Sequence, residues 1–163
     1  MRLNRKNVFF AEKHKMNCSE NELNLLTINI GFANHQADWN WKNVRSPFAR
    51  IYLVTEGEAK VIIEDRCIRL TPGHLYFIPA YTTHSYVCTG LFCHYYLHLY
   101  EDNISGTSMM DEWSLPTEIE SVRMDGELLK RLCDINPLLK LPESNPDSYD
   151  NNQTLINNIQ LNK

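Results

Sequence analysis

Between residues 25 and 99 the chain is a succession of short apolar segments, each rich in β-branched and aromatic residues and each followed by turn-forming residues. Such side chains favour extended backbone, whereas Gly, Pro, Asp and Asn interrupt it. Hairpin turns are expected at 56–58 and 64–66, and Thr-Pro-Gly breaks the pattern at 71–73. The predicted strands are 25–32, 50–54, 59–63, 66–70, 74–78 and 92–100. Because no helical segment separates them, the pattern predicts a mainly β fold, an antiparallel sandwich or small barrel.

The pattern changes after residue 101. Polar and small residues over 103–113 predict a loop. Asp125 is expected to cap a helix over 126–135, which Pro137 ends because proline disfavours helical backbone before it. A weaker helical pattern covers 152–161.

The composition is close to that of an average globular protein and argues against nucleic-acid binding by these residues. Of the 163 residues, 43% are hydrophobic and 22% charged, and the formal net charge is −4. Binding DNA needs a basic surface, which an acidic chain without basic helices does not offer. No segment approaches the ~18 consecutive apolar residues of a membrane span, and no signal peptide is recognisable. The five cysteines contain no C-x-x-C pair, so we expect free thiols and a cytoplasmic protein.

The most informative motif is a glycine, a proline and a histidine at fixed spacing. Gly73 is followed after five residues by Pro79, and His84 stands five residues beyond that proline. This spacing resembles the second motif of the cupin family, in which a glycine turn enters a strand, proline ends it, and a bend aims the imidazole into a barrel. Tyr81 stands where that family usually has a turn glycine, so we expect the bend to be made differently.

The first cupin motif normally supplies two histidines and a glutamate to a metal ion, and its ligands have no counterpart here. If Gly57 is the glycine that ends this motif, Arg50 takes the glutamate position and 43–46 cover the histidine positions. The positive charge of Arg50 would repel a metal ion. His84 alone cannot hold zinc or iron, which need about three protein ligands in catalytic sites. We therefore expect no metal and no other cofactor.

The wider pattern resembles the sensor half of AraC-type transcription regulators. The resemblance rests on 50–57, on "GHLYFIPAYTTHSY" from Gly73 and on "CHYYLHLYED" from Cys93. It implies a cupin-like double-stranded β-helix, a jelly-roll barrel, followed by one or two α-helices. The implied parts are an amino-terminal arm (1–24), the barrel (25–105), a helical packing or dimerisation region (106–145) and a linker (146–163). It also implies a homodimer, a small-molecule effector such as a saccharide, and control of an attached helix-turn-helix domain that these residues do not contain.

Alternation along the strands predicts which side chains face the barrel interior. Arg50 and Tyr52 share one face of their strand, and His94, Tyr96 and His98 share one face of a later strand. The resemblance places Tyr86 and Tyr96 at sugar-contacting positions. The resemblance also implies a sugar-contacting arginine just upstream of the strand that begins at Arg50. Arg45 is the nearest arginine, but the alignment then needs a gap; Lys42 occupies the position without a gap. The predicted ligand-binding residues are Arg45, Arg50, Tyr52, His84, Tyr86, His94, Tyr96 and His98.

Other interpretations of the barrel interior remain open. An interior rich in tyrosine and histidine is also compatible with a packed core in which the hydroxyl and imidazole groups hydrogen-bond to one another or to the backbone. The chain would then be a free-standing interaction module that binds no small molecule. A small cupin isomerase or dioxygenase would need a metal held by His84 with His94 and His98. Trp39 and Trp41 lie on one strand face, where they either cover the mouth of the barrel or anchor its core.

The helix over 126–135 carries an apolar stripe that something must cover. Its members are Leu128, Leu129, Leu132 and Ile135. The stripe either packs on the outer wall of the barrel or seals a dimer against a second copy. We expect it to pack on its own barrel and to leave part of the stripe to a partner subunit.

Overall fold

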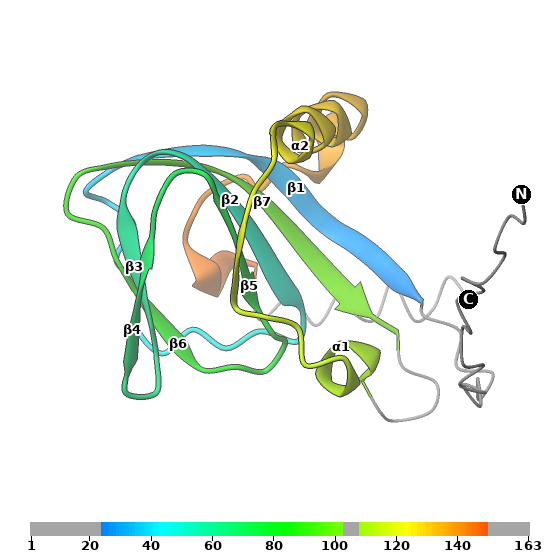
Figure 1. The fold of residues 1–163 in the computed structure, drawn as a ribbon, viewed down its shortest axis with the longest axis horizontal. Coiled ribbons are helices and arrows are strands. Elements are labelled where there is room, and N and C mark those ends of the chain that lie inside the picture. The colour runs from blue at the N-terminus through cyan, green and yellow to red at the C-terminus, as the bar shows by residue number, and fades with distance from the viewer. Residues whose placement is uncertain (1–23, 103–107, 150–163) are drawn as a thin grey trace, which may run out of the picture.

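Two antiparallel sheets face each other in the computed structural model, which describes residues 24–102 and 108–149 (Figure 1). One sheet has the strand order β1-β7-β2-β5-β8 and the other has the order β4-β3-β6. The strands are β1 (Leu25–Gln36), β2 (Ala49–Gly57), β3 (Ala59–Ile63), β4 (Arg66–Leu70), β5 (His74–Ile78), β6 (His84–Val87), β7 (Leu91–Glu101) and β8 (Glu118–Glu120). The helices are α1 (Met109–Glu112) and α2 (Arg123–Ile135), followed by the short 3-10 helices η1 (Pro137–Leu139) and η2 (Pro146–Ser148). The predicted mainly β, cupin-like fold is confirmed.

The core lies between the two sheets and follows the predicted alternation of side chains. On β2, Tyr52 and Val54 belong to the buried cluster between the sheets, whereas Leu53 belongs to a second cluster on the outer face. On β7, Tyr96 faces inward opposite Tyr52, and Leu97 packs outward. The face assignments made from the sequence are therefore confirmed for both strands.

One of the two predicted hairpins is wrong. The turn at 64–66 joins β3 to β4 as a two-residue hairpin, with Ile63 paired to Arg66. At Gly57, however, the chain leaves the first sheet and enters the second, so β2 and β3 do not pair. Gly57 has a φ of 69°, which glycine adopts readily because it has no Cβ. A local turn signal does not distinguish a hairpin from a crossing between sheets.

Several strand limits differ from the prediction because pairing partners, not local composition, set them. β1 runs on to Gln36 because it pairs with β7 along its whole length. The four-residue β6 is held by β3 on one side, and the three-residue β8 extends the first sheet by pairing with β5. Neither β6 nor β8 was predicted, since segments this short carry little periodic signal.

The helical predictions need two corrections. Helix α2 begins at Arg123, so Asp125 lies within its first turn and does not precede it; its carboxylate accepts a hydrogen bond from the Val122 N–H at 2.8 Å. The segment predicted as a loop contains the one-turn helix α1, whose Met110 packs against Ala49 and Phe77. The helix predicted over 152–161 lies outside the described residues.

The apolar stripe of α2 is divided between the barrel and solvent. Leu129 is buried against Ile30 and Leu53, and Leu132 packs beside it. Leu128 and Ile135 are 56% and 55% exposed. After α2 the chain crosses back over the barrel through residues 137–149, which we call the strap (Figure 1). Within the described residues, no helix has the length and apolarity needed to span a bilayer.

Candidate functional site

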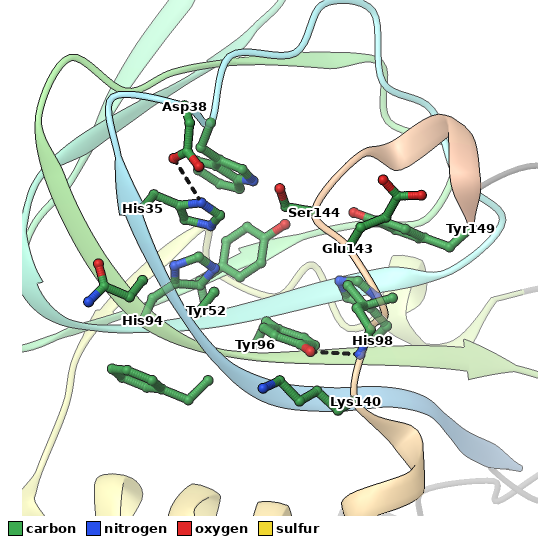
Figure 2. A pocket seen from close by; sticks show the side chains of 15 residues that line it. His35, Asp38, Tyr52, His94, Tyr96, His98, Lys140, Glu143, Ser144 and Tyr149 are labelled. Carbon is green, nitrogen blue, oxygen red and sulfur yellow. Dashed lines mark hydrogen bonds and ion pairs between the residues drawn. The ribbon is translucent and has the colours of Figure 1, made fainter.

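A cavity of about 220 Å³ lies between the inner face of the first sheet and the strap (Figure 2). Its walls come from three parts of the chain that are far apart in sequence: strands of the barrel, the loop after β1, and the strap. The side chains that the figure labels along it are His35, Asp38, Tyr52, His94, Tyr96, His98, Lys140, Glu143, Ser144 and Tyr149. An engineered apolar cavity of about 150 Å³ accepts benzene, so this one has room for a substituted six-membered ring.

A chain of hydrogen bonds leads from the barrel wall to this cavity. Nδ1 of His84 lies 2.7 Å from the Thr82 carbonyl oxygen, and Nε2 lies 2.7 Å from the Tyr86 hydroxyl. The Tyr86 hydroxyl in turn lies 2.7 Å from the hydroxyl of Tyr52, which lines the cavity. We call these residues the relay: Thr82, His84, Tyr86 and Tyr52. His84 and Tyr86 themselves lie behind the cavity wall.

The histidines of this region are held in their neutral form. Burial, together with the positive charge of Arg50, lowers the pKa of His84 to about 4. Burial also lowers the pKa of His94 to about 3, helped by the neighbouring His35. The pKa of His98 lies well below its usual range for the same reason, with Arg50 and His94 adding to the effect. At neutral pH the inner wall therefore presents uncharged imidazoles.

His94 is the most unusual member of the wall. It is 2% exposed, and in the described part of the chain its Nδ1 has no hydrogen-bond partner. Its ring stacks on Phe92 and meets the ring of Tyr52 edge-on, with centroids 4.6 and 5.0 Å apart. A buried polar group without a partner costs roughly 1–3 kcal/mol, so such a group is unexpected in a wall that serves packing alone.

His35 closes one end of the cavity. Its Nδ1 lies 3.3 Å from Asp38 Oδ1, and its ring stacks on Trp39 at 5.4 Å (Figure 2). Burial lowers the pKa of His35, and the Asp38 carboxylate opposes this effect. Trp39 and Trp41 lie in the loop after β1, and not on a strand as was predicted. Trp39 is buried in the core and also lines the cavity, and Trp41 packs against the core.

The strap is fastened to the barrel by Tyr96. The Leu141 N–H donates to the Tyr96 hydroxyl at 2.9 Å (Figure 2), and Asn29 Nδ2 donates to the Leu139 carbonyl at 3.4 Å. Gly31 pairs with Tyr96 in the sheet, and a Cβ at Gly31 would lie 2.3 Å from the tyrosine hydroxyl oxygen. The absence of a side chain at this position makes room for the tyrosine. Burial raises the pKa of Tyr96, so the phenol remains protonated.

The two predicted arginines lie elsewhere. Arg45 is exposed, and its Nε donates to the Tyr81 carbonyl at 3.0 Å while its guanidinium lies 5.4 Å from the centre of the Tyr81 ring. Tyr81 has a φ of 58°, the left-handed backbone that glycine adopts most readily. At this bend a tyrosine therefore stands in a conformation that glycine favours, and Arg45 helps to hold it. Arg50 is 1% exposed, donates to Ser46 Oγ at 2.6 Å and does not line the cavity.

The described residues do not form a site for a metal ion. Both ring nitrogens of His84 are engaged, one by the Thr82 carbonyl and the other by the Tyr86 hydroxyl. Across 24–102 and 108–149, no three His, Cys, Asp or Glu side chains come close enough to hold a metal. The hypothesis of a metal held by His84 with His94 and His98 therefore has no supporting geometry.

Half of the predicted ligand-binding residues come together in the cavity: Tyr52, His94, Tyr96 and His98. Sequence reasoning missed His35 and Asp38, because the first strand was predicted to end at 32. It also missed Lys140, Glu143, Ser144 and Tyr149 of the strap, a polar segment in which no periodic signal marks the functional side chains. The position of this segment over the barrel is known only from the tertiary structure.

Two facing antiparallel sheets that enclose a cavity with mixed polar and aromatic walls define a cupin-type ligand-binding domain. Comparison with protein families agrees: the family described as AraC-like ligand binding domain matches residues 29–155, and the chain belongs to this family.

Solved structures that are similar to the chain have low sequence identity to it. A cupin superfamily protein from Desulfitobacterium hafniense is 20% identical, with a TM-score of 0.41 over 47% of this chain and 78% of that one. The EutQ protein of Clostridium difficile is 17% identical, with a TM-score of 0.37 over 45% and 66%. The DMSP lyase DddQ from Ruegeria pomeroyi is 15% identical, with a TM-score of 0.38 over 63% and 57%. Among curated proteins, none matches this chain.

Proposed function

We propose that this chain is the effector-binding domain of an AraC-type transcription regulator in the cytoplasm, and that the effector is a small uncharged molecule such as a saccharide. The observation that carries the proposal is His94, a 2% exposed imidazole with an unpartnered Nδ1 among the described residues, in the wall of a 220 Å³ cavity. Ligand sites typically combine aromatic walls with a few polar groups of this kind.

The distribution of charge favours an uncharged effector. The inner wall is made of neutral imidazoles, phenols and an indole, whereas the charged groups Asp38, Lys140 and Glu143 are exposed at the rim. A charged molecule in the interior would lose its hydration without gaining an opposite charge on the inner wall.

The strap supplies a route for the signal. It contributes Glu143, Ser144 and Tyr149 to the cavity, and Tyr149 stacks on His98 with centroids 5.6 Å apart. An effector that contacts these residues favours one position of the strap and so changes how a DNA-binding domain joined beyond it is held.

Filling the cavity tests the proposal. Ala33 lines the cavity from the inner face of β1, so Ala33→Leu adds bulk where the effector would lie. We expect a screen of uncharged metabolites by thermal shift to find a molecule that stabilises the wild type, and Ala33→Leu to remove this shift. The variant Ile119→Ala serves as control and is expected to keep the shift, because Ile119 is exposed on β8 and does not line the cavity. A shift that persists in Ala33→Leu, or no shift with any metabolite, contradicts the proposal.

We further propose that α2 forms a homodimer through the part of its apolar surface that the barrel leaves uncovered. Met124, Leu128 and Ile135 are 67%, 56% and 55% exposed on this helix. The double variant Leu128→Glu and Ile135→Glu is expected to convert a dimer into a monomer in analytical ultracentrifugation, since charges oppose burial of this face.

A contrasting variant separates dimerisation from stability. Leu129 is buried on the barrel, so Leu129→Ala is expected to lower the unfolding free energy by about 2–5 kcal/mol and to leave the subunits associated under native conditions. A wild-type chain that sediments as a monomer at every concentration contradicts the proposed dimer.

A further inference from the structure

The imidazole of His35 is held in one position at the end of the cavity. It is 4% exposed and packs against the rings of Trp39, His94 and Phe92, with centroids 5.4, 5.6 and 6.3 Å apart. Close packing of this kind leaves a buried side chain few alternative rotamers, so its two ring nitrogens keep fixed directions. Because His35 also lines the cavity, a ligand there meets an imidazole of fixed orientation.

The turn that follows β1 places the Asp38 carboxylate beside this imidazole. Asp38 Oδ1 accepts a hydrogen bond from the Gln36 N–H at 3.0 Å. Ala37, between them, has a φ of 62°, and its N–H donates to the Gly90 carbonyl at 2.9 Å, which ties the turn to the barrel. The same Asp38 oxygen lies 3.3 Å from His35 Nδ1 (Figure 2). The carboxylate is thus held at this nitrogen, although its side chain is 64% exposed.

The nitrogen beside the carboxylate carries the proton of the ring. Burial lowers the pKa of His35, so at about pH 8 the imidazole is neutral and has a single N–H. A carboxylate only accepts hydrogen bonds, and its negative charge attracts a proton, so this N–H is at Nδ1, next to Asp38. Nε2 is then an acceptor, and no group in the described part of the chain donates a hydrogen bond to it. What His35 offers to the cavity is a nitrogen lone pair.

We propose that Asp38 fixes His35 as a hydrogen-bond acceptor in the cavity, so that the effector is an uncharged molecule that donates a hydrogen bond from a hydroxyl or N–H group to His35 Nε2. The inference rests on the proposed function and names the class of effector. A molecule that can only accept would leave Nε2 of this buried ring unpaired and would bind more weakly. In this arrangement His35 contacts the effector, and Asp38 acts through His35 as a positioning residue.

Nitrogen-15 NMR of the histidine rings measures the tautomer directly, because a protonated and a bare ring nitrogen give well-separated signals. At about pH 8 we expect the wild type to carry the His35 proton on Nδ1. Asp38→Asn removes the charge at an exposed position and is expected to move about half of the molecules to the Nε2–H form. Asp65→Asn is the matched control: it makes the same change at an exposed carboxylate in the turn between β3 and β4, outside the cavity lining, and should leave the tautomer unchanged.

Two probes of the same shape test the preference for a donor. Indole has an N–H where benzofuran has an oxygen that can only accept. In calorimetric titrations we expect the wild type to bind indole about tenfold more tightly than benzofuran, because benzofuran leaves His35 Nε2 unpaired. The ratio is expected to fall to about threefold or less in Asp38→Asn and to stay at the wild-type value in Asp65→Asn. D-xylose is titrated in parallel as a molecule whose donors are hydroxyl groups.

Each outcome supports or overturns the inference. Tighter binding of indole than of D-xylose, or the reverse, identifies the donor as an N–H or a saccharide hydroxyl, and both fit. A proton on Nε2 in the wild type, an unchanged tautomer in Asp38→Asn, or equal affinities of the wild type for indole and benzofuran overturns it. If the inference fails in this way while a metabolite binds and is blocked by Ala33→Leu, the proposed function stands. If the tautomers are as expected and no molecule binds, the proposed function fails, and the inference fails with it.

Discussion

Lowering the pH from 7 to 4 is expected to reduce the unfolding free energy of this domain by about 3–6 kcal/mol, mainly through its buried histidines. In the unfolded chain a histidine has a pKa near 6.5, whereas in the folded protein the pKa is about 4 for His84 and about 3 for His94. Between these values the unfolded chain binds protons that the folded protein does not. The stability is therefore complete above pH 6.5 and is lost as the pH falls toward 4 and 3.

Urea unfolding at pH 7, 6, 5 and 4.5 measures this loss. Carboxylates also titrate in this range, so the comparison between wild type and His94→Phe is the informative one. The variant removes one buried titrating group, so the slope of its unfolding free energy against pH is expected to be smaller than that of the wild type by about 1.4 kcal/mol per pH unit. At neutral pH its stability should match or exceed that of the wild type, because an unpartnered buried nitrogen is replaced by carbon.

Ile78→Val is the control for the pH experiment. Ile78 is fully buried and does not titrate, so this variant is expected to lower the unfolding free energy by about 0.5–1.5 kcal/mol at every pH and to leave the slope of stability against pH unchanged. Parallel slopes for the wild type and His94→Phe would contradict the assignment of a buried neutral imidazole to position 94.

Gly57→Ala is expected to destabilise the fold by about 3 kcal/mol or more. A Cβ at this position would lie 1.9 Å from the carbonyl oxygen of Leu91 and 2.5 Å from its carbon, so the obstacle is backbone and cannot rotate away. The φ of 69° adds the cost of left-handed backbone, roughly 1–2 kcal/mol for a residue with a Cβ. Here β2 leaves the first sheet, and the Glu58 N–H donates to the same Leu91 carbonyl at 3.1 Å. Relief by backbone movement would break that bond.

Two further glycines separate the steric cost from the conformational cost. Gly73 has a φ of 82°, but no described atom lies within 4 Å of its Cβ position, so Gly73→Ala should cost about 1–2 kcal/mol. Gly90 has open space in the described structure and no positive φ, so Gly90→Ala should change stability by about 0.5 kcal/mol or less. In urea unfolding, the loss of unfolding free energy should be largest for Gly57→Ala, smaller for Gly73→Ala and smallest for Gly90→Ala. A cost at Gly57 no greater than at Gly73 would contradict the close backbone approach.

How much of the site the sequence predicts depends on where each residue lies relative to a strand. His94, Tyr96 and His98 were found because alternation along β7 is local and places all three on one face. Arg45 was assigned to the ligand by resemblance alone, and the structure places it on the surface beside Tyr81. The strap residues carry no comparable pattern.

The sequence by itself determined where six of the eight described strands lie and which side chains of β2 and β7 face inward, and its motifs pointed to the family to which the chain belongs. The strands and their faces follow from interactions between neighbours along the chain, which leave a periodic trace in composition. Only the tertiary structure decided that the chain changes sheets at Gly57, that hydrogen bonds link His84 to the cavity residue Tyr52 through Tyr86, and that the strap forms a wall of the cavity. Each of these depends on contacts between residues far apart in sequence, such as the bond from Leu141 to Tyr96, for which a single chain carries no local signal.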